Sequence, residues 1–275
     1  MGKKLSLFLI IMCLFVVSGC RNSEKASDVL RVGMDLKYPP FMYMDDSGEP
    51  VGLEVDIAKA FGQYLDKEIE IINTDFSMLI PSLETGETDI LISDISVNEE
   101  RKQKVAFTKP YRYGKTLALV NREYYEKHEV SDDMDAQSFF DLNDMRAIGL
   151  SGTISVSIPR KYGVGVVEIT EIASGLMEIN SGTSNVLVGS YKVFGDHAAN
   201  EKTTEIYSGI KDYSMSAFAI RKEDDYLRER ANEFIDKMYD KGGLYEQLKE
   251  KYDGPIDDYL EAKGLGLEYI ITKPE

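Results

Sequence analysis

The stretch from Asp89 to Arg101 constrains the fold of this chain more than any other. Its apolar run, residues 90–92, predicts a buried strand, and the charged residues after it predict a helix. Open α/β sheets bind their ligands where such a strand meets a helix N-terminus, and the free N–H groups there favour an anion. The polar residues at this junction are candidate binding residues: Ser93, Asp94, Ser96 and Arg101.

A simpler interpretation of the same stretch stays open. Ser96 is followed three residues later by Glu99, which fits a capping box at a helix N-terminus. In that case Ser96 only caps the helix and Arg101 is a solvated surface charge.

The composition predicts a globular protein with an acidic surface. The chain has 275 residues, of which 43% are hydrophobic and 29% charged, which is enough for two lobes with cores of their own. The formal net charge of -16 argues against nucleic acid or an anionic lipid surface as a partner, because both need a basic face.

The N-terminus has the pattern of a secretory signal peptide over residues 1–19. Two lysines precede a short apolar run that ends in Ser18-Gly19-Cys20. This ending resembles a bacterial lipobox, which implies cleavage before Cys20, lipidation of its thiol, and a polar tether over residues 20–28. Cys20 is then the only cysteine of the mature chain, so no disulfide can form within it. The alternative is a plain signal peptide with an incidental cysteine.

The remaining chain alternates between predicted strands and helices, which indicates an α/β protein with a partly parallel sheet. Strands are predicted at 29–34, 69–72, 116–120, 147–150, 166–169, 186–188 and 215–220, and helices at about 54–66, 78–85, 171–181 and from 226 onward. Residues 121–135 read as an exposed loop that begins a second domain, and residues 254–275 show no clear period. The segment 84–89 resembles the segment 180–185, which suggests two similar halves.

Several motifs across residues 30–112 occur together in one order. They are Asp35-x-x-Tyr38-x-Pro40-Phe41, Gly52-Leu53-Glu54-x-Asp56, Leu79-Ile80-Pro81 with Gly86 and Asp89, Ser96-x-x-x-x-Arg101, and Phe107-Thr108-x-Pro110-Tyr111. In this order and spacing they resemble the amino-acid type (family 3) of bacterial extracellular solute-binding proteins, which serve ABC importers. The second half matches more loosely, through Gly152-Thr153 and Gly182-x-x-Asn185.

The resemblance implies a two-lobed periplasmic-binding-protein fold (type II) with a two-strand hinge. Lobe 1 would comprise residues 29–113 and 221–275, and lobe 2 residues 114–220. The resemblance also implies that Arg101 binds a ligand carboxylate, as a planar guanidinium suits. It assigns further ligand contacts to Ser96, to Ser93 and Asp94 at the strand end, to Tyr38 and Phe76 as aromatic walls, to Asp35 at the polar end of the ligand, and to Thr153 in lobe 2.

Two positions depart from the family pattern. Ser190 stands where the family usually has an aspartate that binds the ligand ammonium, and Ile154 stands where a second hydroxyl is common. A bound ammonium without a carboxylate would be poorly compensated in a closed cleft. One hypothesis is that Asp94 supplies the missing charge; the alternative is that Asp94 only caps adjacent backbone at the strand end.

The function implied is a non-catalytic, extracytoplasmic receptor that captures a small amino acid, polar or cationic, and delivers it to an ABC permease. It would be attached to the cell membrane by its lipid only and use no cofactor or metal. The alternatives are a dehydratase-like enzyme on the same fold, for which His128 and His197 are the sparse acid–base candidates, and a sensory ligand-binding protein.

Overall fold

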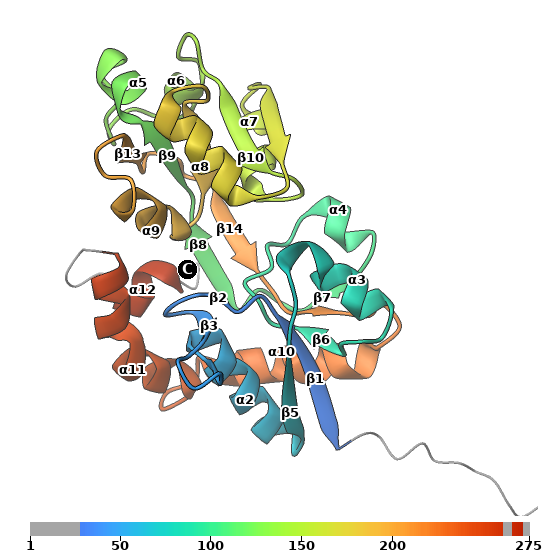
Figure 1. Ribbon diagram of the computed structural model, residues 1–275. Coiled ribbons are helices and arrows are strands. Elements are labelled where there is room, and N and C mark those ends of the chain that lie inside the picture. The colour runs from blue at the N-terminus through green and yellow to red at the C-terminus, as the bar shows by residue number, and fades with distance from the viewer. Residues whose placement is uncertain (1–27, 261–265, 272–275) are drawn as a thin grey trace, which may run out of the picture.

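The computed structural model describes residues 28–260 and 266–271. The predicted signal peptide, Cys20 and most of the predicted tether therefore lie outside the described residues. The chain forms two lobes, each with a five-stranded sheet that is covered by helices on both faces. Figure 1 shows lobe 1 below, lobe 2 above, and two strands that pass between them.

The sheet of lobe 1 is mixed and has the strand order β5-β1-β6-β15-β7. Strand β1 is parallel to β5 and β6, whereas β15 is antiparallel to β6 and β7. Because β15 comes from far along the chain, the C-terminal part of the chain returns to lobe 1. The strands are β1 (Val29–Met34), β5 (Glu68–Asn73), β6 (Ile90–Leu91), β7 (Ala106–Phe107) and β15 (Ala219–Ile220).

Helices cover both faces of this sheet because successive side chains of a strand point in opposite directions. Ile90 and Ile92 pack with the helices α2, α10 and α11, while Leu91 packs against α3 on the other face. A small three-stranded sheet, a 3₁₀ turn and a one-turn helix complete the lobe. The bounds are α2 (Leu53–Leu65), α3 (Leu79–Glu84), α4 (Glu99–Lys102), α10 (Asp225–Met238), α11 (Leu244–Tyr259), β2 (Lys37–Tyr38), β3 (Met42–Met44), β4 (Pro50–Val51) and η1 (Phe76–Met78).

Lobe 2 repeats this arrangement on a sheet with the order β11-β10-β12-β9-β13. Helices α5, α6 and α7 share one apolar core with alternate residues of β9 and β12, and α8 and α9 share another on the opposite face. The strands are β9 (Leu117–Asn121), β10 (Ala147–Leu150), β11 (Val166–Ile169), β12 (Val186–Gly189) and β13 (Thr204–Tyr207). The helices are α5 (Arg122–Lys127), α6 (Ala136–Phe140), α7 (Ile154–Lys161), α8 (Ile172–Ser181) and α9 (Lys192–Ala198).

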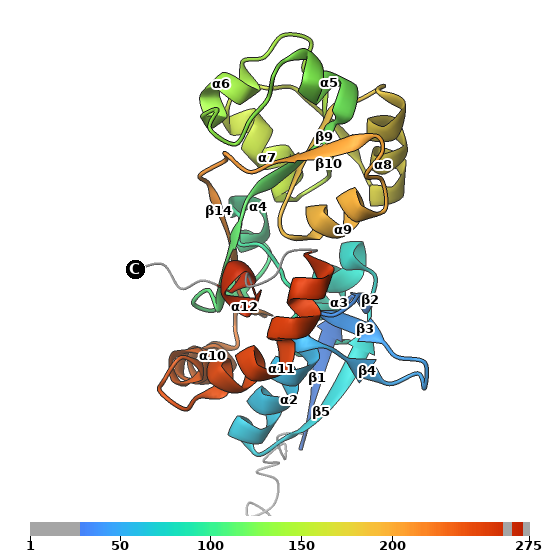
Figure 2. The same cartoon turned by 90° about the vertical axis from the view of Figure 1, so that its left-hand side faces the viewer.

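The two lobes are connected by an antiparallel pair of strands, β8 (Arg112–Lys115) and β14 (Tyr213–Ser216). Beside them lies the C-terminal helix α12 (Gly266–Ile270), which contacts β8 and places Tyr269 edge-on against Phe194 of lobe 2 at 5.9 Å. Figure 2 shows α11 and α12 between the lower lobe and α9 of the upper lobe. The C-terminal segment therefore touches both lobes.

The segments 84–89 and 180–185 hold equivalent places in the two lobes. Each contains a glycine with positive φ, Gly86 and Gly182, followed by the residue before a central strand. The Asp89 carboxylate accepts the backbone N–H of Arg31 at 3.0 Å, and the Asn185 side chain accepts that of Arg146 at 2.7 Å. A polar side chain at the equivalent position, Asp89 in lobe 1 and Asn185 in lobe 2, thus binds the backbone of the neighbouring strand in both lobes.

Three local predictions were wrong. Residues 121–135 are not all loop, because the Asn121 side chain accepts the N–H of Tyr124 at 3.1 Å and starts helix α5. The predicted strand 215–220 is split into β14 and β15, since Phe218 turns into the lobe 1 core between them. The capping residue of α4 is Asn98 and not Ser96, as the Asn98 side chain accepts the N–H of Arg101 at 2.8 Å.

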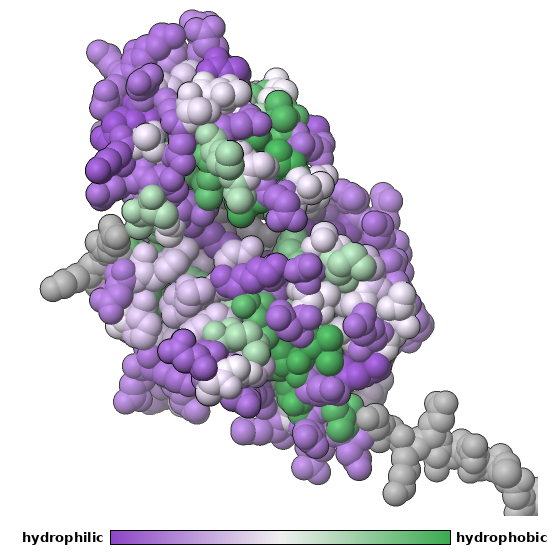
Figure 3. Space-filling view, viewed as in Figure 1, coloured by the Kyte–Doolittle hydropathy of each residue, from purple (hydrophilic) through white to green (hydrophobic). Residues whose placement is uncertain are grey.

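The face of the molecule seen in Figure 3 is mainly hydrophilic. Apolar side chains gather on it over α8 and β11, where Met177 and Val167 are exposed, and over lobe 1 near β1 and β5. Within the described residues, no helix is both long enough and apolar enough to span a bilayer.

Candidate ligand-binding cleft

A cleft of about 540 Å³ lies between the lobes, and this volume is within the range of small-molecule sites. Lobe 1 contributes residues from its first strand–loop junction, the start of α3 and helix α4. Lobe 2 contributes residues 150–152, at the end of β10, and residues 169–172, between β11 and α8. Four of the predicted site residues line this one cleft, and together they are called the cleft-lining group: Asp35, Tyr38, Phe76 and Arg101.

Arg101 is held in the cleft wall by the short helix α4. Its side chain is 8% exposed, its Nη1 donates to the carbonyl of Ser96 at 2.9 Å, and its guanidinium lies 5.2 Å from the ring centre of Phe76. Burial lowers the pKa of Arg101, but a guanidinium still stays protonated in proteins. Among the described residues, no carboxylate forms an ion pair with Arg101. A cation in the cleft wall without an acidic partner suits the carboxylate of a ligand.

Asn98, which the sequence analysis did not single out, contributes to the same wall. Its side-chain oxygen caps α4, and its Nδ2 donates to the carbonyl of Gly152 in lobe 2 at 3.0 Å. One side chain therefore positions Arg101 and joins the two lobes. An Asn ahead of a charged helix is a common N-cap signal, so its capping role could have been predicted.

Asp35 is the buried acid of the cleft. It is 3% exposed, its backbone N–H donates to the Ser93 hydroxyl at 3.0 Å, and its Oδ1 has no hydrogen-bond partner within the described chain. The nearest cation is the Lys37 ammonium, 3.6 Å from Oδ1. Burial raises the pKa of the Asp35 carboxyl, and Lys37 opposes this in part. Ser93 is itself buried, and its hydroxyl oxygen accepts the hydrogen bond that fixes the Asp35 backbone.

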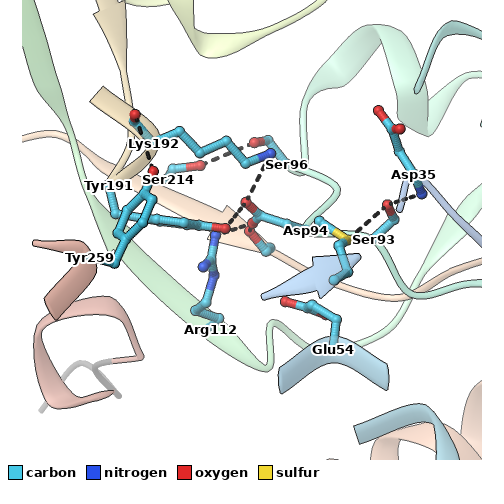
Figure 4. Close-up of polar contacts among 12 residues, drawn as sticks. Asp35, Glu54, Ser93, Asp94, Ser96, Arg112, Tyr191, Lys192, Ser214 and Tyr259 are labelled. Carbon is cyan, nitrogen blue, oxygen red and sulfur yellow. Dashed lines mark hydrogen bonds and ion pairs between the residues drawn. The ribbon is translucent and has the colours of Figure 1, made fainter. Parts of the chain in front are cut away.

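Asp94 lies deeper, beside the strands that connect the lobes, and has a positive φ of 51°. Its carboxylate is ion-paired with Arg112 and accepts from the Ser216 hydroxyl at 2.6 Å and from the Tyr191 hydroxyl at 3.1 Å. Lys192 Nζ lies 3.8 Å from its Oδ2. These five residues, shown in part in Figure 4, are called the Asp94 network. Asp94 is not among the residues that line the cleft.

The charges of the Asp94 network compensate one another. Burial acts to raise the pKa of the Asp94 carboxyl, but Arg112 and Lys192 outweigh it and hold the pKa below its usual value. The neighbouring Glu54 is fully buried, and both its oxygens accept from the Tyr111 hydroxyl at 2.7 Å. Burial raises the pKa of Glu54 to about 7, although Arg112 acts in the opposite direction.

Besides Ser93 and Asp94, three further predicted site residues are not among the residues that line the cleft. The Ser96 hydroxyl hydrogen-bonds with Ser214 at 3.1 Å, beneath Arg101. The Thr153 hydroxyl donates to the Leu150 carbonyl at 2.7 Å and caps α7. Ser190 is half-buried just before α9, where its carbonyl accepts from Val193 at 3.0 Å. Their contacts with a ligand stay predictions.

The two histidines named from the sequence lie away from the cleft in lobe 2. His128 packs on Tyr124 with 4.4 Å between ring centres, and His197 shares a hydrogen bond with Thr204 at 3.0 Å. Within residues 28–260 and 266–271, no group of three or more His, Cys, Asp or Glu could hold a metal ion.

Comparisons with known proteins agree with this architecture. The probable amino-acid-binding protein YxeM of Bacillus subtilis (strain 168) is 27% identical, and the match covers 91% of this chain and 95% of that protein. The histidine-binding periplasmic protein of Salmonella typhimurium (strain LT2) is also 27% identical, over 91% of this chain and 96% of that protein.

Among solved structures, the ancestral amino acid-binding protein AncCDT-1, a precursor of cyclohexadienyl dehydratase, superimposes with a TM-score of 0.64 at 27% identity. The match covers 82% of this chain and 94% of that chain. Holo ArgBP from T. maritima gives a TM-score of 0.61 at 28% identity, over 82% of this chain and 95% of that chain. The two-lobed binding-protein fold predicted from the sequence is confirmed.

The family model described as bacterial extracellular solute-binding proteins, family 3, matches residues 30–255, which is most of the chain. The chain therefore belongs to this family of extracellular solute-binding proteins.

Proposed function

We propose that this protein is a non-catalytic receptor that captures a small amino acid, polar or cationic, between its lobes and delivers it to an ABC permease. The observation that carries the proposal is the placement of Arg101 in the cleft wall with no acidic partner among the residues that the structure describes, and with the buried Asp35 lining the same cleft. A ligand with a carboxylate and a separate cationic or polar group would match both charges.

The family and the names of the relatives support this proposal. The similar proteins include an amino-acid-binding protein and a histidine-binding protein, and an arginine-binding protein of Bacillus subtilis, ArtP, is 27% identical over 91% of this chain and 98% of that protein. Lobe closure on a ligand would shift an open–closed equilibrium, because a bridging ligand binds the closed state more tightly.

The proposal is tested by calorimetric titration of the protein with the proteinogenic amino acids, together with Arg101→Lys and, as a control, Arg228→Lys on the surface of α10. At least one polar or cationic amino acid should bind, and Arg101→Lys should weaken its binding about a hundredfold, since Lys cannot offer two parallel N–H donors. Arg228→Lys should change affinity less than twofold. Absence of binding by the whole panel, or a reaction product of a bound ligand in mass spectrometry, would contradict the proposal.

We also propose that the mature protein is anchored to the cell membrane by a lipid on Cys20. The support is the lipobox-like ending of residues 17–20, since Cys20 lies outside the described residues. In membrane fractions of cells that express the full chain, a Cys20→Ala variant should move to the soluble fraction. Retention of that variant in the membrane at the wild-type level would exclude the anchor.

A further inference from the structure

Lys192, the first residue of helix α9 in lobe 2, places its ammonium group against lobe 1, beside the cleft-lining Tyr38. The ammonium group of Lys192 lies 3.9 Å from the ring centre of Tyr38 and 3.8 Å from Oδ2 of Asp94. Figure 4 shows the Lys192 side chain extended toward Asp94, with Ser96 beside its end. The Lys192 side chain is 27% exposed, so its charge is partly shielded from water. Both contacts are of the kind that bind a ligand ammonium, an aromatic face and a carboxylate.

The position of Lys192 is set by its surroundings. The adjacent Tyr191 is 2% exposed, packs on Phe41 of lobe 1 with 4.2 Å between ring centres, and donates its hydroxyl hydrogen to Asp94. On the other side, the hydroxyl of Tyr259 in α11 donates to the Lys192 carbonyl at 3.3 Å. The backbone of Lys192 is therefore held against lobe 1 by its neighbour Tyr191 and by Tyr259 of α11, so its side chain starts close to Asp94 and Tyr38.

This placement changes what the cleft can recognise. The charge of Asp94 is already met by Arg112 and Lys192, and one face of Tyr38 is already covered by a cation. A ligand ammonium at the same place would meet the like charge of Lys192 and would have to displace it. Asp35 is the acid of the cleft whose Oδ1 still has no hydrogen-bond partner within the described residues.

We propose that Lys192 is a specificity-determining residue of this cleft: its ammonium fills the place between Tyr38 and Asp94, so that the α-ammonium group of a ligand adds little to affinity. The class of ligand this selects is a small carboxylate whose cationic or polar group lies away from the carboxylate and reaches Asp35. The inference rests on the proposed function, because it assumes that Arg101 holds the ligand carboxylate.

The test compares ligands that differ in a single group. L-arginine, L-lysine and L-glutamine are each titrated against the wild type beside the analogue in which hydrogen replaces the α-ammonium group. For the pairs that bind, the wild type should bind both members with affinities within about threefold. Lys192→Met should raise the preference for the amino acid to about tenfold or more, because the Tyr38 face is no longer covered and Asp94 keeps only one of its two cations.

The matched control is Lys202→Met, a lysine on the exposed surface of lobe 2, which should keep the wild-type ratio. A wild-type preference for the amino acids of more than about tenfold, or an unchanged ratio in Lys192→Met, would overturn the proposal.

A second measurement needs no ligand and separates this proposal from the proposed function. If none of the proteinogenic amino acids binds the wild type, the proposed function fails. The contact of Lys192 is then measured by a double-mutant cycle of melting temperatures with Tyr38→Leu and Lys192→Met. A cation over an aromatic ring should leave the two shifts non-additive by roughly 2 °C. Additive shifts would show that Lys192 does not occupy the Tyr38 face and would overturn the inference by themselves.

Discussion

The cleft-lining group and the Asp94 network differ in where their charges find partners. In the cleft, Arg101 has no acidic partner among the described residues and Asp35 keeps an oxygen without a hydrogen bond. In the network, Asp94 has two cations and two hydroxyl groups around it. Nε and Nη1 of Arg112 in the network have no hydrogen-bond partner within the described residues, but its charge is paired with Asp94. A charge without a counter-charge in a cleft is available to a ligand, whereas paired buried charges serve the structure. We therefore propose that the cleft-lining group binds the ligand and that the Asp94 network joins the lobes.

The largest predicted difference between the two groups is in the stability that is lost when one arginine is removed from each. Arg112→Met leaves the buried Asp94 without its main counter-charge, and loss of one partner of a buried ion pair typically costs about 3–5 kcal/mol of unfolding free energy. Arg101→Met removes a cation that pairs with no acid in the described part of the chain, so its cost should stay near 1 kcal/mol or below. Urea unfolding of both variants measures the two losses.

The double variant Asp94→Asn with Arg112→Met separates charge from packing. Because it removes the buried Asp94 charge together with its main counter-charge, and leaves only the partly exposed Lys192 without its carboxylate partner, it should recover part of the stability that Arg112→Met loses. Equal losses in the two single arginine variants would instead mean that the groups do not differ in the way proposed.

A smaller effect is expected from Glu54, the carboxyl buried next to the Asp94 network. Its pKa of about 7 in the folded protein is above the ordinary value of 4.5 in the unfolded chain. As the pH rises from 4.5 to 7, the unfolded chain releases this proton first, so stability falls by on the order of 3 kcal/mol and stays lower above pH 7. Glu54→Gln keeps an acceptor for Tyr111 but has no proton to release.

Melting curves from pH 4.5 to 8 should therefore show Glu54→Gln gaining stability relative to the wild type as the pH rises. The exposed acid Glu49 supplies the control. Glu49→Gln should show no such gain in stability relative to the wild type as the pH rises. A wild type that gains stability relative to Glu54→Gln as the pH rises would show that the pKa of Glu54 is not raised in the folded protein.

The two groups also differ in how far they could be predicted from the sequence. The cleft-lining residues follow strands or start helices within lobe 1, so short motifs over residues 35–101 were sufficient to single them out. Their local positions depend on strand ends and helix starts, which leave clear marks in a sequence. Most strands and the longer helices of both lobes were predicted for the same reason, whereas the short strands β7 and β13 were not.

The Asp94 network could not be found in this way. Its partners come from residues 112, 191, 192 and 216, on two connecting strands and the start of α9, and no local pattern joins them. Helix α9 is short and was not predicted, and the tail that supports Lys192 through Tyr259 continues helix α11 across Pro255. Contacts between distant segments depend on the tertiary fold, which overrides local propensity.

The smallest predicted effect is a change in ligand affinity, and it concerns Asp35 of the cleft-lining group. If Asp35 binds the cationic group of a ligand, Asp35→Asn should weaken the binding of L-arginine and L-lysine by about tenfold. The binding of L-glutamine should weaken by less than threefold, because its side chain is neutral and loses no ion pair. The control variant Asp46→Asn removes an exposed acid that is not among the cleft-lining residues, and it should change affinity less than twofold. Calorimetric titration gives each ratio directly. Equal losses for charged and neutral ligands would mean that Asp35 acts on the shape of the cleft and not through its charge, and the cationic preference would then need another acid.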